Sequence, residues 1–312
     1  MENRFNIFKS KWAFGVICLL LFYGLFFIEL DLAVTRLENE LWNLLHLLGF
    51  FVIWMFLMNI VPQFAPKNIK HFGLVVVLTI LVSGAIEFVQ HYIGRSASVK
   101  DIALNLAGTL VATTTIIFTK KYLRPWQPVV IVISLVAILG LLWPSLKIFI
   151  DELYIEKNFP VLSDFSAPYE LSRWGRWKAK YRLDEHEGKQ ALHVTFEKGA
   201  RYSNIALNSF GQEWIKYKQL VLRVHNPGSI ALTLNIRLHD RKHRESYYDH
   251  RDRFIRTVHI QPGTSEITID LFDVYKAPEG RRMNINEIES IMMFTVNLDE
   301  QRDLIIEKIF LR

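Results

Sequence analysis

Five long apolar runs dominate the first 150 residues, and they constrain the fold more than any other feature of the chain. They lie at about 12–30, 44–62, 73–92, 102–119 and 128–147. A helix that crosses a bilayer needs about 20 mainly apolar residues, and each run approaches or meets that length. The sequence therefore predicts an all-α bundle of five transmembrane helices in residues 1–150.

The charges beside these runs indicate how the bundle is oriented. Residues 1–150 carry 12 Lys and Arg against 7 Asp and Glu, whereas the rest of the chain carries 25 against 24. Eight of the 12 cations precede the first run or lie in the second and fourth connections. Because positively charged loops stay in the cytoplasm, we expect a cytoplasmic N-terminus and an extracytoplasmic C-terminal half. The basic excess is a topology signal, so no nucleic-acid partner is expected.

The segment IEFVQHYIGRSASVKDIALN (86–105) joins the third and fourth runs and is unusually polar. Helical spacing places Glu87 and Gln90 on one face of the third helix, and Asp101 and Asn105 on one face of the fourth. His46 lies near the same end of the second helix. An ionisable residue in a membrane helix costs about 2.5–3.5 kcal/mol and is a functional-site hypothesis by default. We therefore expect one outward-facing polar pocket.

Structural roles for these residues stay open as alternatives. Glu87 could pair with Arg95 or His46 and simply hold the helices together. Ser98 and Asp101 match a capping-box pattern at the start of the fourth helix. Gln90 and Asn105 could be interhelical hydrogen-bonding partners.

These polar positions resemble the signature of the VanZ-like family of small bacterial membrane proteins. The resemblance covers about residues 30–120 and rests on His46, Glu87-x-x-Gln90, Arg95, Ser98-x-x-Asp101 and Asn105-x-x-Gly108. One departure is that Glu38-Asn39-Glu40 stands where an acidic-basic pair often precedes the histidine. The resemblance implies a bacterial cytoplasmic (inner) membrane protein and a link to low-level resistance to the glycopeptide teicoplanin. It also implies a functional polar set, which is His46, Glu87, Gln90, Arg95, Asp101 and Asn105, but it supplies no reaction.

From about residue 161 the pattern changes to short alternating segments with turn phrases such as HNPGS (225–229) and QPGT (261–264). Eight strands in about 150 residues are typical of a β-sandwich, here predicted as an all-β jelly roll over 161–312 after a linker at 151–160. The chain is thus expected to be a multidomain membrane protein. The expected strands are Leu192–Phe196, Asn204–Leu207, Leu220–His225, Ala231–His239, Phe254–Ile260, Glu266–Leu271, Ser290–Leu298 and Leu304–Leu311.

The order of these strands and turn phrases resembles the galactose-binding-like sandwiches of many carbohydrate-binding modules, over about 160–312. The resemblance implies glycan binding. A sugar site needs an aromatic ring for the apolar face of the sugar and polar side chains beside it. The candidates are Trp174, Trp177, Tyr202, Tyr247 and Tyr248, with Asp249 and Arg251 in the polar run 239–253. A solvated hairpin tip is the alternative for that run.

Metal and cofactor signals are weak. Asp240 and His243 are the best metal-ligand candidates, with Asp249 and His250 near them, but no HExxH or paired CxxC spacing occurs. The sandwich resemblance implies that a structural calcium could be present. No nucleophile elbow, P-loop or dinucleotide-binding glycine pattern is present, so no cofactor is expected. The single cysteine, Cys18, cannot form a disulfide within the chain.

Three functions fit these observations. The first is an envelope protein that presents a glycan-binding sandwich beside the polar pocket, with membrane lipids and a cell-envelope glycan or glycolipid as partners. The second is a membrane enzyme that acts on a lipid-linked or peptidoglycan-related substrate. In it Glu87, Asp101 and His46 would handle protons while Arg95 neutralises phosphate. The third is a structural adaptor for a partner protein. The sequence does not indicate an oligomeric state.

Overall fold

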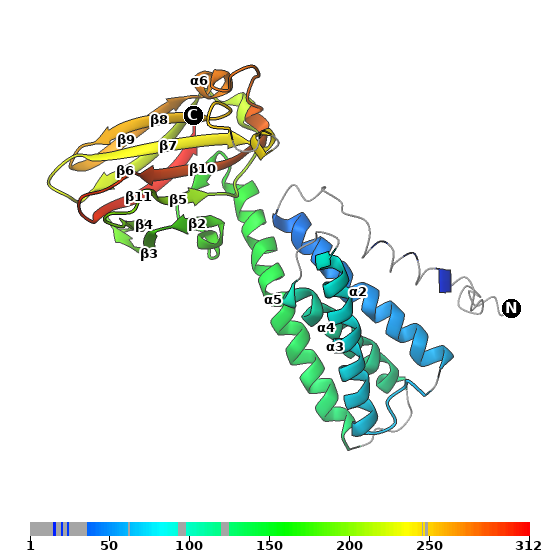
Figure 1. The fold of residues 1–312 in the computed structure, drawn as a ribbon. Coiled ribbons are helices and arrows are strands. Elements are labelled where there is room, and N and C mark those ends of the chain that lie inside the picture. Colours follow the sequence, from blue (N-terminus) through cyan, green and yellow to red (C-terminus); the bar gives the residue numbers. More distant parts are fainter. Residues whose placement is uncertain are drawn as a thin grey trace. The chain divides into compact units, whose positions relative to one another are not determined.

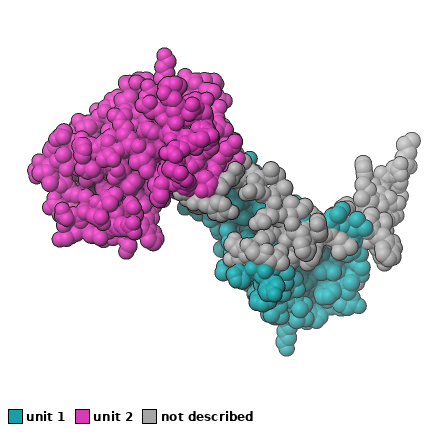
Figure 2. All heavy atoms as spheres, turned by 45° about the horizontal axis from the view of Figure 1, so that its top comes forward, with its two compact units in different colours: residues 1–147 teal, residues 148–312 magenta. Residues whose placement is uncertain are grey.

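The fold is described from a computed structural model, shown in Figure 1. The description covers residues 15, 16, 20, 24, 36–61, 63–92, 98–119, 125–244, 246 and 249–312. The chain divides into two compact units, Met1–Lys147 and Ile148–Arg312, which Figure 2 colours separately. The first unit is helical and the second is built mainly of strands, as the change of sequence pattern predicts.

The described part of the helical unit consists of long apolar helices. They are α2 (Arg36–Ile60), α3 (Ile69–Tyr92), α4 (Val99–Phe118) and the first part of α5 (Gln127–Asn158). All four are long and apolar enough to cross a membrane, which agrees with the second to fifth predicted spans. The first predicted span, 12–30, lies almost entirely outside the described residues.

Helix α5 extends further than its apolar run. It continues through Pro144 and ends at Asn158, so residues 151–158 are helical where the sequence pattern placed a linker. The run KIFIDELYIEKN (147–158) contains no glycine or proline to interrupt the helix. The helix ends before Phe159 because a residue that precedes proline disfavours the helical conformation.

Helices α2 and α4 approach each other closely. A Cβ atom on Gly108 would lie 2.2 Å from the Leu47 carbonyl oxygen and 2.9 Å from the Phe51 nitrogen, so only glycine fits there. Ala107 and Ala112 are buried on the same helix. Small residues allow membrane helices to pack backbone against backbone. The Gly108 position of the family signature therefore has a packing role.

The second unit is a β-sandwich of two antiparallel sheets with jelly-roll character (Figure 1). The six-stranded sheet has the order β3 (Ala179–His186), β4 (Lys189–Phe196), β11 (Arg302–Leu311), β6 (Gln219–Asn226) and β9 (Gly263–Asp270), with β1 (Val161–Ser163) paired to β11. The five-stranded sheet has the order β2 (Trp174–Trp177), β5 (Ser203–Leu207), β10 (Ile288–Thr295), β7 (Leu232–Asp240) and β8 (Phe254–Ile260). Short helices complete the unit: η2 (Glu170–Arg173), η3 (Trp214–Lys216), η4 (Arg241–Arg244), α6 (Leu271–Lys276) and η5 (Ile285–Glu287).

All eight predicted strands are present, and β1, β2 and β3 are additional. Strand β3 was missed because it is an edge strand whose residues, AKYRLDEH, are mostly exposed and charged. Charged side chains are common on edge strands, where they discourage pairing with other chains. The alternating apolar pattern thus identified the edge strands β8 and β9, but it could not identify the charged edge strand β3.

One core lies between the two sheets. It contains side chains from both, including the fully buried Phe196, Leu234, Ile291 and Trp214. The last turns of α5 join this unit through a buried ion pair. Arg173 donates to Asp151 from Nε at 2.9 Å and from Nη2 at 2.6 Å. The pair fixes the end of α5 to the start of the sandwich.

Candidate functional site

His46 of α2 faces Asp101 of α4 in the helical unit. The His46 Nε2 and Asp101 Oδ2 atoms are 3.9 Å apart, which is too long for a hydrogen bond. His46 is buried, and the Asp101 side chain is 16 % exposed. A water or ligand atom between these two groups could exchange protons with either one.

Glu87 of α3 takes over part of the predicted capping box. Ser98 is the N-cap residue of α4, but its side chain makes no capping hydrogen bond. Its backbone N–H donates to Glu87 Oε2 at 2.7 Å. In a capping box, the backbone N–H of the N-cap residue bonds the side chain three residues later, which would be Asp101 in this helix. The capping-box prediction is therefore wrong: the neighbouring helix supplies the acceptor, and Asp101 faces His46.

Gln90 and Asn105 are both fully or almost fully buried. The Nδ2 and Oδ1 atoms of Asn105 have no hydrogen-bond partner among the described residues. An unsatisfied buried polar group costs about 1–3 kcal/mol, so its presence requires an explanation. Asn105 lies one helical turn after Asp101 on α4. A polar ligand or water at this face of α4 would satisfy the amide.

Glu40 forms a second polar contact that the sequence analysis missed. Its carboxylate accepts hydrogen bonds from Lys100 Nζ at 2.6 and 2.7 Å, and from Ser145 Oγ at 2.8 Å. The two partners are 60 and 105 residues away in sequence, so helical spacing could not reveal the contact. The only feature of the sequence that set Glu40 apart was its departure from the family signature. Arg95, the remaining member of the predicted polar set, lies outside the described residues.

The outer face of the five-stranded sheet carries a row of neutral side chains. Strand pairing aligns one residue from each strand, in the order Trp177, Asn204, Phe294, Asn235 and Thr257. Their neighbours along β5, β10 and β7 point into the core, so the row faces outward. Thr257 Oγ1 donates to Asn235 Oδ1 at 2.7 Å. The row thus combines two aromatic rings, two amides and a hydroxyl.

Two of the predicted glycan-binding aromatics lie at this face. Trp177 is 64 % exposed and Tyr202 is 46 % exposed. The Tyr202 ring lies edge-on to Phe294, with 6.0 Å between the centroids. The sequence analysis missed Phe294 because one aromatic in an alternating strand gives no sign of which face it occupies.

Three of the other predicted glycan-binding residues contact groups within the sandwich. Trp174 is buried and stacks on Phe165 in the core, so it is removed from the candidates. Asp249 and Arg251 bond to each other, with Arg251 Nη2 donating to Asp249 Oδ2 at 2.9 Å. This pairing agrees with a solvated hairpin tip. Tyr247 and Tyr248 lie outside the described residues.

The weak metal-ligand candidates are engaged by arginine. Arg281 donates to both oxygens of Asp240 at 2.7 Å and also bonds Asp252. These hydrogen bonds hold the pKa of the Asp252 carboxyl below its ordinary value. His243 is buried, with Nδ1 3.5 Å from Asp252 Oδ2, and burial lowers the pKa of its imidazole. A guanidinium thus occupies the place of a cation at Asp240, and we withdraw that residue as a metal ligand.

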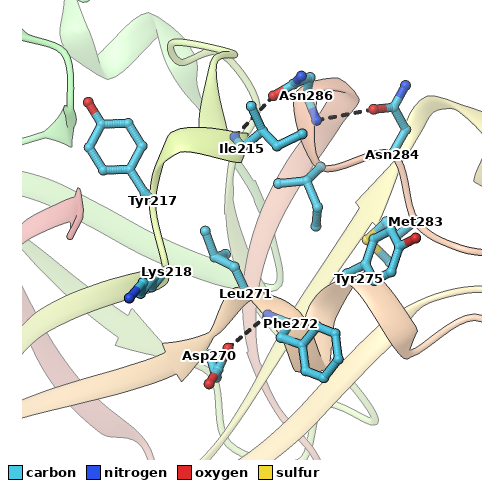
Figure 3. Close-up of a pocket in the computed structure, with 11 residues that line it drawn as sticks. Ile215, Tyr217, Lys218, Asp270, Leu271, Phe272, Tyr275, Met283, Asn284 and Asn286 are labelled. Atoms are coloured by element: carbon cyan, nitrogen blue, oxygen red, sulfur yellow. Dashed lines mark hydrogen bonds between the residues drawn. The ribbon is translucent and has the colours of Figure 1, made fainter.

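A pocket of about 720 Å³ opens at one end of the sandwich (Figure 3). Its wall is mainly apolar and aromatic, with Tyr217, Leu271, Phe272 and Tyr275. Three of the polar side chains that Figure 3 labels accept backbone N–H bonds: Asp270 from Phe272 at 2.8 Å, Asn284 from Asn286 at 3.2 Å, and Asn286 from Ile215 at 3.2 Å. The pocket contains none of the predicted site residues, because it is formed by η3, α6 and η5, which are far apart in sequence.

Comparison with known families identifies the helical unit. The family model described as VanZ/LLP1 matches residues 4–120. The VanZ-like resemblance of the polar signature is therefore confirmed, and the match with four membrane-capable helices makes this a membrane protein. No curated protein sequence matches the chain significantly.

Solved structures similar to this chain include carbohydrate-binding modules and an agarase. The family 11 carbohydrate-binding module from Clostridium thermocellum, in complex with a β-1,3-1,4-mixed-linked tetrasaccharide, is 12% identical, with 48% of this chain and 93% of that chain covered and a TM-score of 0.39. The family 30 module of a cellulosomal cellulase from the same organism is 12% identical, with 45% and 89% covered and a TM-score of 0.34. An exo-β-agarase is 12% identical, with 49% and 25% covered and a TM-score of 0.39. The sandwich fold of this chain rests on its own strand pairing.

Proposed function

We propose that this membrane protein binds a neutral glycan of the cell envelope through the outer face of its five-stranded sheet. The observation that supports the proposal most directly is the row from Trp177 to Thr257, in which strand register aligns aromatic and amide side chains. Sugar rings present an apolar face that packs on aromatic rings, and hydroxyls that bond amides.

The length and charge of the row favour an oligosaccharide without ionised groups. Four steps between strands about 4.8 Å apart extend over about 19 Å, which exceeds the size of one sugar. None of the five side chains in the row is ionisable. A charged ligand would leave its charge without a counterion in this row, whereas hydroxyl groups find both donors and acceptors there.

The test is binding of the full chain, in detergent, to an array of bacterial envelope and plant glycans. We expect retention of neutral β-linked oligosaccharides, and a loss of about 30-fold for Trp177→Ala or Phe294→Ala, because a buried aromatic anchor contributes about 2 kcal/mol. Phe272→Ala is the matched control, since Phe272 is 59 % exposed but lies outside the row. Absence of any glycan bound by the unaltered chain would contradict the proposal, as would equal loss in the control.

For the orientation in the membrane, we propose that the N-terminus is cytoplasmic and the sandwich extracytoplasmic, as the charge distribution predicts. The chain has one cysteine, so Cys18→Ser combined with Ser229→Cys places a single thiol at an exposed position of the sandwich. We expect a membrane-impermeant maleimide to label that thiol in intact cells. Labelling only after lysis would reverse the proposed orientation.

A membrane-embedded enzyme is the second candidate function, and the arrangement of His46 and Asp101 favours it. The 3.9 Å separation and the unsatisfied Asn105 amide leave a place for a polar substrate group at the face of α4. The proposed substrate is a lipid-linked or peptidoglycan-related molecule, with Glu87 and Arg95 as further participants.

Glycopeptide susceptibility of cells that express the protein provides the readout for this second candidate. We expect Asp101→Asn to abolish any protection against a teicoplanin-type glycopeptide while the amount of protein in the membrane stays unchanged. A parallel fall in protein amount would favour the structural-adaptor alternative instead.

A further inference from the structure

The outer face of the six-stranded sheet gathers ionisable side chains from strands that are far apart in sequence. His186 ends β3, His225 lies on β6, and Glu307 lies on the central strand β11. Strand β11 shifts register against β6 between Ile306 and Lys308, which places Glu307 at a bulge. Bulges re-aim side chains and often lie beside functional sites. The three residues are separate from both sites described above.

The geometry of this cluster is that of metal ligands. One ligand atom from each residue lies within 4.8 Å of the other two. The His186 Nε2 and Glu307 Oε1 atoms are 3.5 Å apart. Two ligand atoms about 2.0–2.2 Å from a tetrahedral zinc ion are separated by about 3.3–3.6 Å. A small rotation of the imidazoles, whose centroids are 4.5 Å apart, would complete the arrangement.

Two of the three ligand atoms lack hydrogen bonds. The side-chain atoms His186 Nε2 and Glu307 Oε1 are inaccessible to solvent, and neither has a hydrogen-bond partner among the described residues. Buried polar atoms are otherwise nearly always paired, and a bound ion is one of the recognised explanations for an exception. The two atoms face each other at 3.5 Å, so a single ion could contact both.

Neighbouring residues orient the ligands as a metal site requires. Thr264 Oγ1 lies 3.0 Å from His225 Nδ1, which leaves Nε2 of His225 as the nitrogen available to a metal. Arg223 Nε donates to Glu307 Oε2 at 2.9 Å, so the other carboxylate oxygen remains available. Metal-binding histidines and carboxylates normally have outer partners of this kind.

The chain conformation also holds His186 in place. The β3–β4 hairpin turns through Glu187 and Gly188, both with positive φ (50° and 77°), as in the tight turn that matches strand twist. His193 is the third imidazole on this face, with its ring centroid 6.4 Å from that of His186. Burial lowers the pKa of the His193 imidazole, which favours its uncharged form.

We propose that His186, His225 and Glu307 bind one divalent transition-metal ion of the zinc class. Two imidazoles and one carboxylate favour such ions over calcium or magnesium, which prefer all-oxygen sites. Three protein ligands leave a fourth position open, as in catalytic rather than structural zinc sites. His186 and Glu307 line a pocket of about 520 Å³, so a small ligand can reach that position.

The direct test is titration of the full chain with Zn²⁺, in detergent and without a polyhistidine tag, by calorimetry. We expect one ion per chain and at least about 100-fold weaker binding for His225→Ala and Glu307→Gln, because loss of a ligand exceeds the 10–100-fold effect of outer partners. His259→Ala is the matched control, since His259 Nδ1 has the same 3.0 Å contact with a threonine on the other sheet. Its Zn²⁺ affinity should equal that of the unaltered chain.

A second variant keeps the test valid if a ligand substitution disturbs folding. Thr264→Val preserves side-chain shape and should weaken Zn²⁺ binding about tenfold through the loss of an outer partner. Visible absorption of the Co²⁺-loaded chain should show the bands of a tetrahedral site, and these should be absent in Glu307→Gln. The proposal is overturned if the unaltered chain takes up no Zn²⁺, or if the ligand variants bind it as well as the control does.

Discussion

Two buried aspartate–arginine pairs of the sandwich and the polar face of α4 in the helical unit differ in how fully their hydrogen bonds are satisfied. In the sandwich, Arg173 and Arg281 donate two or more hydrogen bonds each to buried aspartates. In the helical unit, His46 and Asp101 remain 3.9 Å apart, and the Asn105 amide has no partner within the described part of the chain. A polar group whose hydrogen bonds are all made within the protein, here called saturated, cannot bond a ligand as well. A group that lacks such partners can. The comparison therefore separates structural ion pairs from candidate binding groups.

The largest expected effect is on the saturated pair Asp151–Arg173. Both side chains are almost completely buried, so Asp151→Ala should destabilise the protein by about 3–5 kcal/mol by leaving an uncompensated buried charge. Denaturant unfolding of the full chain in detergent, followed by tryptophan fluorescence, measures the change.

A double variant tests the reason for this effect. Asp151→Leu combined with Arg173→Met removes both charges, and buried pairs replaced by apolar residues often lose little stability. We expect the double variant to be more stable than Asp151→Ala. If the double variant is less stable than Asp151→Ala, the hydrogen bonds of the pair contribute more to stability than the unpaired charge costs.

A smaller and pH-dependent effect is expected at Asp252. Its pKa is lowered in the folded protein by the hydrogen bonds from Arg281, so its contribution is present above the unfolded value of about 3.9 and disappears as pH falls through the folded value. Asp252→Asn should cost about 1.5–3 kcal/mol at pH 7, the range for a hydrogen bond to a charged group. Thermal unfolding from pH 7 to pH 3 should show the two stabilities converging in acid.

The control for this measurement is Asp184→Asn. Asp184 is exposed and bonds Arg182 on the same strand, so its removal should leave stability almost unchanged at every pH. If the stabilities of the wild type and Asp252→Asn diverged at low pH, the assigned direction of the Asp252 pKa shift would be wrong.

An effect of intermediate size is expected at Glu87, which is buried and accepts a hydrogen bond from the start of α4. Glu87→Leu removes the acceptor for the Ser98 N–H and should cost about 0.5–2 kcal/mol, as for loss of other helix caps. Glu87→Gln keeps an acceptor oxygen and should preserve most of that stability. Unfolding of both variants in detergent measures the difference, and equal losses would show that the charge, not the cap, is required.

The smallest effect on stability is expected at Asn105. Asn105→Leu replaces an unsatisfied amide by an apolar group of similar shape, so stability should stay within about 0.5 kcal/mol or rise. Under the membrane-enzyme candidate the same variant should lose glycopeptide protection. A large loss of stability would place Asn105 among the structural groups and remove the distinction between it and the buried ion pairs of the sandwich.

Much of this architecture could be predicted from local sequence patterns. Apolar runs indicated four of the helices that the structure describes, and alternation indicated eight of the eleven strands of the sandwich. Edge strand β3 and the helical end of α5 were missed. The first has no apolar alternation, and the second is polar helix beyond the apolar run.

The candidate sites could be predicted only in part. Helical spacing grouped Asp101 with Asn105, yet it could not show that Glu87 accepts a hydrogen bond at the start of α4. Aromatic residues in strands gave no sign of their face, so Trp174 was proposed for a surface and Phe294 was overlooked. The zinc-type cluster escaped detection entirely, because its three ligands come from residues 186, 225 and 307.

Local sequence patterns were sufficient for the class of the protein, which is a set of membrane-capable helices with a VanZ-like signature, followed by an antiparallel sandwich. The helices and strands depend on periodicities within about 20 residues, and the signature depends on residue types at fixed positions, so none of them requires a tertiary contact. Which polar groups meet depends on strand register and helix packing, because these bring together residues more than 100 positions apart. The contacts of Glu40 with Ser145 and of His186 with Glu307 have no trace in local pattern, and they arise solely from that long-range pairing.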